Sequence, residues 1–135
     1  MNVVKDLLCD QFQDTVNEYL IRHRSVLDIM AKLQESQARV NRAITKAVTS
    51  CGCVQVHATR QQYPADATLE QLRDHVQSHV SGKLCDHCRE VVEAELGNSL
   101  FYLAALCNTF DLNLYDIILQ EQKKLSALGV YNFAD

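Results

Sequence analysis

Two close pairs of cysteines, Cys51-Gly52-Cys53 and Cys85-Asp86-His87-Cys88, constrain this chain more than any other feature. Residues 54–84 separate the pairs, so a fold that brings them together offers four soft sulfur ligands around one point. Such a ligand set suits Zn²⁺, with an iron–sulfur cluster as the alternative. His57, His79 or His87 could replace one sulfur. We therefore expect a closed, structural metal site formed by Cys51, Cys53, Cys85 and Cys88.

The same cysteines have two other interpretations: free thiols, or a reversible disulfide between Cys85 and Cys88 that senses redox conditions. Residues 1–20 are repeatedly interrupted by charged side chains and lack the hydrophobic core of a secretion signal. No segment has the apolar length that a membrane span needs. We therefore expect a cytoplasmic protein without membrane association, in which thiols stay reduced and metal binding is favoured over a disulfide.

Composition favours a single helical domain. Hydrophobic residues make up 47% of the 135 residues, and the chain has only one proline and four glycines, so few positions force a helix to break. We expect one all-α domain over residues 1–135, with residues 51–84 as a metal-stapled insertion. The net charge is −4 and the basic residues form no block, so nucleic-acid binding is not expected.

Helical periodicity and capping signals predict about five helices. Ser25, Thr68 and Asn113 are the expected N-caps, and Thr68 has Gln71 in the position of a capping-box partner. Val54-Gln55-Val56 is expected to be a short extended segment, and the tail from residue 129 to 135 is expected to pack on a neighbour. The predicted helices cover residues 3–22, 26–48, 69–81, 86–110 and 114–128.

Each predicted helix carries an apolar stripe that is expected to face the core. In the second helix Gln37 stands where an apolar residue belongs, which indicates either solvation or a pocket. The expected core positions are Val4, Leu7, Leu8, Phe12, Val16, Tyr19 and Leu20 in the first helix; Val26, Met30, Leu33, Val40, Ile44 and Val48 in the second; Leu69, Leu72, Val76 and Val80 in the third; Val92, Leu96, Leu100, Leu103, Cys107 and Phe110 in the fourth; and Leu114, Ile117, Ile118 and Leu125 in the fifth.

The fourth predicted helix carries a second motif. From Glu95 the chain reads Glu-Leu-Gly-Asn-Ser-Leu-Phe-Tyr-Leu, and residues 110–116 read Phe-Asp-Leu-Asn-Leu-Tyr-Asp. This segment resembles the MazG-type nucleoside triphosphate pyrophosphohydrolases, an all-α family that reads Glu-Leu-Gly-Asp, an apolar residue and Leu-Phe-Tyr-Leu here. The resemblance covers roughly residues 90–119. It is weak over the second helix and absent over residues 51–84.

The resemblance implies a magnesium site built from two carboxylate pairs on facing helices. Family members hold Mg²⁺ with Glu-x-x-Glu and Glu-x-x-Asp, and the metal activates a water that cleaves between the α and β phosphates. Here the pairs become Glu35-x-x-Ala38 and Glu95-x-x-Asn98, so each has lost one carboxylate. Ala38 precedes Cys51 by as many residues as Asn98 follows Cys85, so a cysteine cross-link would place them at one level. The resemblance also gives Lys123 and Lys124 a role in phosphate binding.

These observations predict a MazG-like helical bundle of about five helices with a zinc-stapled insertion. The leading functional hypothesis is a nucleotide-binding protein, with Glu35, Glu95 and Asn98 in a degraded magnesium pocket and some capacity for triphosphate hydrolysis. The alternative is a non-catalytic, zinc-stabilised interaction or regulatory module. The resemblance further implies a homo-oligomer, with the first helix and the tail at Tyr131 and Phe133 as contact surfaces.

Overall fold

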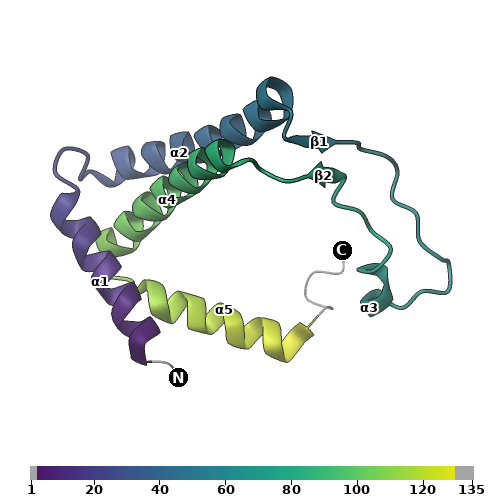
Figure 1. The fold of residues 1–135 in the computed structure, drawn as a ribbon. Coiled ribbons are helices and arrows are strands. Elements are labelled where there is room, and N and C mark those ends of the chain that lie inside the picture. The colour runs from purple at the N-terminus through teal and green to yellow at the C-terminus, as the bar shows by residue number, and fades with distance from the viewer. Residues whose placement is uncertain (1–2, 130–135) are drawn as a thin grey trace.

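The computed structural model describes residues 3–129 and is mostly helical, which confirms the prediction of an all-α fold with about five helices (Figure 1). A two-stranded sheet is added to these helices. Among the described residues, no helix combines the length and apolar character needed to cross a lipid bilayer. The elements in chain order are α1 (Val3–Tyr19), α2 (Val26–Lys46), the π-helical turn η1 (Ala47–Cys51), β1 (Val54–Val56), α3 (Leu69–Leu72), β2 (Val80–Gly82), α4 (Asp86–Thr109) and α5 (Leu114–Leu128).

The helices α2 and α4 lie side by side and make the most extensive contact in the molecule (Figure 1). Small side chains line this contact, because Ser36 and Ala43 of α2 and Ala47 of η1 are all buried. The Ser99 hydroxyl donates a hydrogen bond of 3.0 Å to the Ser36 hydroxyl across the pair. Small residues let two helix backbones approach closely, and each hydroxyl buried there needs a partner. The α2–α4 hairpin is therefore a close-packed pair with few large side chains between its helices.

The hydrophobic core lies where α1 crosses the other end of this hairpin. Val16 of α1, Ile29 of α2 and Ala104 of α4 are at most 1% exposed, and Leu114 at the start of α5 joins them. Gln13 is buried beside this core. Its side-chain amide donates to Asn108 Oδ1 and to the Leu112 carbonyl, both at 3.0 Å, and its oxygen accepts from the Leu114 backbone N–H at 2.7 Å. This one side chain therefore ties α1 to the turn between α4 and α5.

The segment between α2 and α4 forms an arm that extends away from the helices (Figure 1). Its base is the antiparallel pair of β1 and β2, in which Val54 lies opposite Gly82 and Val56 opposite Val80. Further out, Gln61 and Gln77 exchange two hydrogen bonds of 2.8 Å that hold the two sides of the arm together. The predicted extended segment at Val54–Val56 is confirmed as β1.

The prediction of a third helix over residues 69–81 is wrong. The capping box at Thr68 and Gln71 forms as expected, but the helix that it begins ends at Leu72. Val76 and Val80, which were expected in the core, are 44% and 54% exposed. The reason is non-local: residues 80–82 pair with β1, and His79 adopts a left-handed conformation with φ of 63° that a helix does not allow.

Three other helix ends differ slightly from the predictions. The second helix, predicted to residue 48, ends at Lys46, where η1 follows. The first helix ends at Tyr19 rather than at residue 22. Close to this end, the Arg24 guanidinium donates hydrogen bonds to the carbonyls of Asn17 and Leu20. The fourth helix, predicted to residue 110, ends at Thr109. The fifth covers Leu114–Leu128 as predicted, with Asn113 as its cap. The predicted contacts of Tyr131 and Phe133 lie outside the described residues.

The expectation that the large apolar stripes face the core is wrong for much of the chain. Val16, Leu20, Val40, Val92, Cys107 and Leu114 are buried as expected, α2 also buries Ile29, Ser36 and Ala43, and η1 buries Ala47. The surface of the described chain instead carries large side chains from every long helix. Besides Val76 and Val80, the predicted core residues that are exposed are Leu7, Leu8, Tyr19, Met30, Ile44, Leu96, Leu100, Leu103, Phe110, Ile117, Ile118 and Leu125.

Candidate metal centre

The first cysteine pair lies where α2 ends. After Lys46 the chain makes the π-helical turn η1, whose last residue is Cys51, and Gly52 then takes a left-handed conformation with φ of 79°. This conformation is costly for residues with a Cβ atom, so the glycine lets the chain leave the helix sharply. Cys53 follows at once and leads into β1. The turn therefore places two thiols, two residues apart, at the end of one helix.

The second pair lies where α4 begins. Cys85 is the N-cap of α4, and its sulfur accepts a hydrogen bond of 3.4 Å from the Cys88 backbone N–H. Cys88 lies in the first turn of the same helix. The N-cap sulfur lies beside free backbone N–H groups at the positive end of the helix, which favours the thiolate form of Cys85. The helix start therefore supplies the second pair of ligands and stabilises a sulfur anion at Cys85.

The sheet at the base of the arm holds the two pairs together. Val54, next to Cys53, pairs with Gly82, three residues before Cys85. Gly82 has φ of 83°, and a Cβ atom at this position would lie 2.5 Å from the Cys53 carbonyl oxygen. Only glycine permits this close approach. The glycine therefore sets how closely the chain before α4 can approach the chain after α2.

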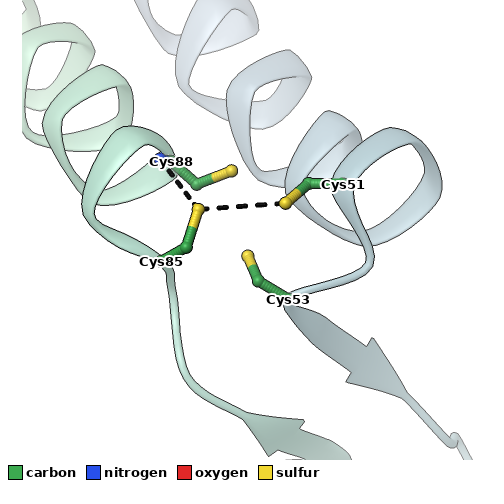
Figure 2. A group of neighbouring side chains, drawn as sticks. All are labelled: Cys51, Cys53, Cys85 and Cys88. Atoms are coloured by element: carbon green, nitrogen blue, oxygen red, sulfur yellow. Dashed lines mark hydrogen bonds between the residues drawn. The ribbon is translucent and has the colours of Figure 1, made fainter.

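Four sulfurs converge as the sequence predicts (Figure 2). The Sγ atoms of Cys51, Cys53, Cys85 and Cys88 all lie within 4.8 Å of one another, and Figure 2 shows the four side chains directed toward a common centre. Cys51 Sγ and Cys85 Sγ are 3.8 Å apart. A tetrahedral ion with metal–sulfur bonds of about 2.3 Å separates its sulfurs by about 3.8 Å. The donor set therefore fits a single four-coordinate metal ion.

All six cysteines lie within residues 3–129 and are free thiols. Cys51 is exposed, while Cys53, Cys85 and Cys88 are partly buried. The sulfur separation of 3.8 Å is far longer than a disulfide bond. A histidine in place of a sulfur, which was an alternative, is not needed here, because the converging group among the described residues consists of cysteines alone.

The thiols do not ionise alike. The hydrogen bond from the Cys88 backbone N–H is the main cause that lowers the pKa of Cys85 to about 7. The Cys85 side chain, and then burial, raise the pKa of Cys88 to about 12. Close sulfurs that share protons in this way resist becoming four thiolates at neutral pH, because four like charges would repel one another. A divalent cation at their centre removes that obstacle and releases the protons.

The two glutamates that the resemblance assigns to magnesium lie around an arginine. Arg39 Nε donates a hydrogen bond of 3.0 Å to Glu95 Oε2. The pKa of Arg39 is raised, first by its hydrogen bond to Glu95 and then by the charge of that carboxylate, with a smaller contribution from Glu35. Glu35 also forms an ion pair of 3.4 Å with Lys32. A guanidinium therefore provides the positive charge that the resemblance assigns to a metal ion.

The positions where carboxylates are missing lie close to one another along the α2–α4 hairpin. The Ser36–Ser99 and Arg39–Glu95 contacts fix the antiparallel register, which places Ala38 opposite residues 96–97 and so within about half a helical turn of Asn98. Both side chains are exposed. Lys123 and Lys124 belong to α5, which contacts α1, and Lys124 pairs with Glu121 at 3.8 Å. The structure therefore brings Glu35 and Glu95 near one another but does not add the two lysines to them.

A small cationic pocket next to Glu95 was missed by the sequence reasoning. It has a volume of about 270 Å³ and is lined by Arg39, Arg42, Lys46, Ala43, Val91 and Glu95. The spacing of Arg39, Arg42 and Lys46 along one face of a predicted helix is the signal that could have revealed it. Three cations against one carboxylate make this pocket favourable for an anion.

Comparison of the chain with protein-family models, with curated proteins and with solved structures gives no match. The resemblance to the MazG-type family therefore stands on the residues quoted above.

Proposed function

We propose that this chain is a binding module in which a structural zinc ion staples a helical hairpin. The observation that carries the proposal is the convergence of four sulfurs on one point between the end of α2 and the start of α4. All four positions of a tetrahedral ion are filled by protein sulfurs, which leaves none for substrate or water. The metal is therefore a cross-link, which supports a binding role rather than catalysis at the metal.

Zinc is favoured over an iron–sulfur cluster by the compactness of the site. A cluster distributes its thiolates over several iron atoms and so spreads them more widely than one ion does. Sulfurs that lie within 4.8 Å of one another fit a single ion better. Elemental analysis of freshly purified protein is expected to give about one zinc per chain, and X-ray absorption at the zinc edge should give four sulfur neighbours. Iron with acid-labile sulfide in the purified protein would contradict the assignment.

The Arg39–Glu95 pair supports a non-catalytic module over a magnesium hydrolase. A carboxylate that is hydrogen-bonded to a guanidinium must lose this partner before it can bind Mg²⁺. We expect the wild-type protein to release no pyrophosphate from nucleoside triphosphates with Mg²⁺ or Mn²⁺. Turnover that disappears in Glu95→Ala but persists in Glu90→Ala, an exposed acid on the same helix, would instead favour the hydrolase.

The pocket at Arg39, Arg42 and Lys46 favours a second candidate function, the binding of a nucleotide through its phosphates. This function agrees with the MazG-type resemblance, because the pocket adjoins Glu95. Nucleoside triphosphate is then expected to raise the melting temperature, and Arg42→Ala to remove that shift. Arg22→Ala, which removes an exposed arginine outside the pocket, is the matched control. The absence of any nucleotide-dependent shift in the wild-type protein would rule this candidate out.

A further inference from the structure

The arm between α2 and α4 contains an open, polar cavity. Its volume is about 530 Å³, which falls within the range of about 300–1,000 Å³ that is usual for small-molecule sites. Residues from both sides of the arm, in segments 57–62 and 75–81, line it. The two hydrogen bonds between Gln61 and Gln77 connect these segments and so hold the two walls together. The arm, which Figure 1 shows extending away from the helices, therefore has a hollow that is held by its own contacts.

The charge that lines this cavity is positive only. Arg60 lines it, none of the lining residues is acidic, and within residues 3–129 Arg60 forms no ion pair with a carboxylate. Residues 54–84 contain three basic and three acidic residues, so the composition of the arm does not explain this one-sided lining. The fold instead keeps the three acids outside the cavity. A cavity with an unpaired guanidinium and no carboxylate favours an anion.

Three of the five histidines of the chain, His57, His75 and His79, also line the cavity. The Nε2 atom of His79 is buried and has no hydrogen-bond partner among residues 3–129. Buried polar atoms in folded proteins are nearly always paired. The backbone of His79 is fixed separately, because its carbonyl accepts a hydrogen bond of 2.8 Å from the His57 backbone N–H and its φ is 63°. The imidazole of His79 is therefore held in the cavity wall with a hydrogen-bonding atom that the fold itself does not use.

A metal ion does not explain these side chains. The converging group of potential metal ligands among the described residues consists of the four cysteines, so the three imidazoles do not share one ion. Arginine and histidine side chains both donate hydrogen bonds to phosphate, and arginine is the side chain best suited to it. The oxygens of a phosphate are arranged tetrahedrally and accept hydrogen bonds from several directions, here from both walls of the arm. The donor set therefore fits a phosphate group.

The rest of the cavity suits a ligand body that is rich in hydroxyl groups. Thr59, Gln62 and Ser81 line it, and their hydroxyl and amide groups both donate and accept hydrogen bonds, as sugar hydroxyls require. The lining contains no phenylalanine, tyrosine or tryptophan. A nucleobase gains much of its affinity by stacking on such rings, so the cavity favours a sugar over a base.

We propose that the arm cavity binds a phosphate monoester of a small polyhydroxylated molecule, such as a sugar phosphate, with Arg60 and His79 on the phosphate. This inference goes beyond the proposed function. The cavity shares no residue with the metal centre or with the pocket at Arg39, and it lies in the segment that the MazG-type resemblance does not cover. The arm is then a ligand-binding element that the zinc-stapled hairpin carries at its end.

Nuclear magnetic resonance of the imidazole rings in the zinc-loaded, full-length protein tests this proposal on the unaltered chain. Glucose 6-phosphate, added at constant pH and ionic strength, is expected to shift the ring signals of His57, His75 and His79. The signals of His23 and His87, which lie outside the cavity, should stay in place. Inorganic phosphate, glucose and adenosine monophosphate are the comparison probes, and each should bind about tenfold more weakly or worse.

Two variants locate the site. Arg60→Ala should weaken binding of glucose 6-phosphate about tenfold or more, because it removes the fixed positive charge. Arg73→Ala is the matched control, since it removes an exposed arginine of the same arm outside the cavity. His79→Asn should also weaken binding while the melting temperature of the ligand-free protein stays nearly the same. The His79 Nε2 atom makes no hydrogen bond that this change would break, and asparagine tolerates the left-handed conformation.

Three results would overturn the proposal. The first is a wild-type protein whose cavity histidines do not respond to glucose 6-phosphate, or in which all five histidines respond alike. The second is an equal loss of binding in Arg60→Ala and Arg73→Ala. The third is binding of inorganic phosphate or adenosine monophosphate that is as tight as that of glucose 6-phosphate, which would show that the sugar is not recognised.

Discussion

Arg39 of α2 and Glu95 of α4 join the two helices at their middle through two hydrogen bonds, from Nε at 3.0 Å and from Nη2 at 3.4 Å. The guanidinium is more exposed than the carboxylate, with 59% of the Arg39 side chain accessible against 19% for Glu95. This pair occupies the level of the hairpin at which the sequence resemblance implies a magnesium ion. It therefore has two separable consequences, one for stability and one for divalent-ion binding.

Arg39→Ala is expected to increase the affinity for Mg²⁺ at Glu95 while it lowers thermal stability only slightly. The stability effect is small because water and salt screen a largely exposed pair. A thermodynamic cycle of Arg39→Ala, Glu95→Gln and the double variant measures the coupling, which should shrink when sodium chloride is added. Divalent binding is followed by isothermal titration calorimetry. A large coupling that salt does not change would contradict the idea of a screened surface pair.

Two glycine substitutions are expected to have opposite effects. Gly82→Ala puts a Cβ atom 2.5 Å from the Cys53 carbonyl oxygen at a φ of 83°, so the base of the arm must shift and zinc affinity should fall about tenfold or more. Gly97→Ala on α4 meets nothing within 4 Å and should stabilise the helix by about 0.5–1 kcal/mol. Competition with a chromophoric zinc chelator measures the first effect, and urea unfolding measures the second. Equal zinc affinity in both variants would show that Gly82 does not position the thiols.

Removal of the metal is expected to destabilise the hairpin. Stripping zinc with a strong chelator, or the change Cys88→Ser, should lower the melting temperature by about 10 °C or more, because a closed site contributes its binding energy to folding. Acid should also release the metal, since protons compete with the ion for the thiolates. Cys9→Ser is the control, because Cys9 lies on α1 outside the group of four. Calorimetry with parallel metal analysis measures both effects, and an unchanged transition in metal-free protein would refute the cross-link.

Substitution of Gln13 is expected to lower the free energy of unfolding more than substitution of most other polar residues. Gln13→Leu removes the acceptor of the Leu114 backbone N–H and the donor to Asn108 Oδ1 and the Leu112 carbonyl, and should cost about 3 kcal/mol. Gln11→Leu on the same helix changes an exposed side chain and should be nearly neutral. Urea unfolding of both variants gives the comparison. Similar free energies of unfolding for the two variants would mean that the Gln13 network contributes little.

Local patterns in the sequence predicted the helices and the thiol cluster well. The capping residues Ser25, Thr68 and Asn113 all accept the hydrogen bonds expected of them, because capping depends on residues only two or three positions away. The cysteine pairs were also predictable, since each falls where a helix must start or stop. The end of the third helix was not, because the pairing of Val80 with Val56 depends on residues far away in the sequence.

The apolar stripes failed as predictors for a different physical reason. Periodicity shows that one face of a helix avoids water, but it does not show whether the same chain or another surface covers that face. In α2 the small residues Ser36 and Ala43 make the contact with α4, while Met30 stays exposed. The contact of Arg39 with Glu95 was not predicted either. Magnesium motifs consist of acidic residues, so they give no indication of a cation that lies between those acids.

The π-helical turn at Ala47–Cys51 makes the metal centre sensitive to chain length. This turn holds one residue more than an α-helical turn, so deletion of a single residue would rotate Cys51 by about 100° around the helix axis and turn its sulfur away from Cys85. The outer part of the arm, beyond the β1–β2 pair, is under no such restriction, because within residues 3–129 none of the extensive contacts between elements involves α3. Insertions and deletions in this protein should therefore accumulate between residues 63 and 74 and be excluded between residues 47 and 53.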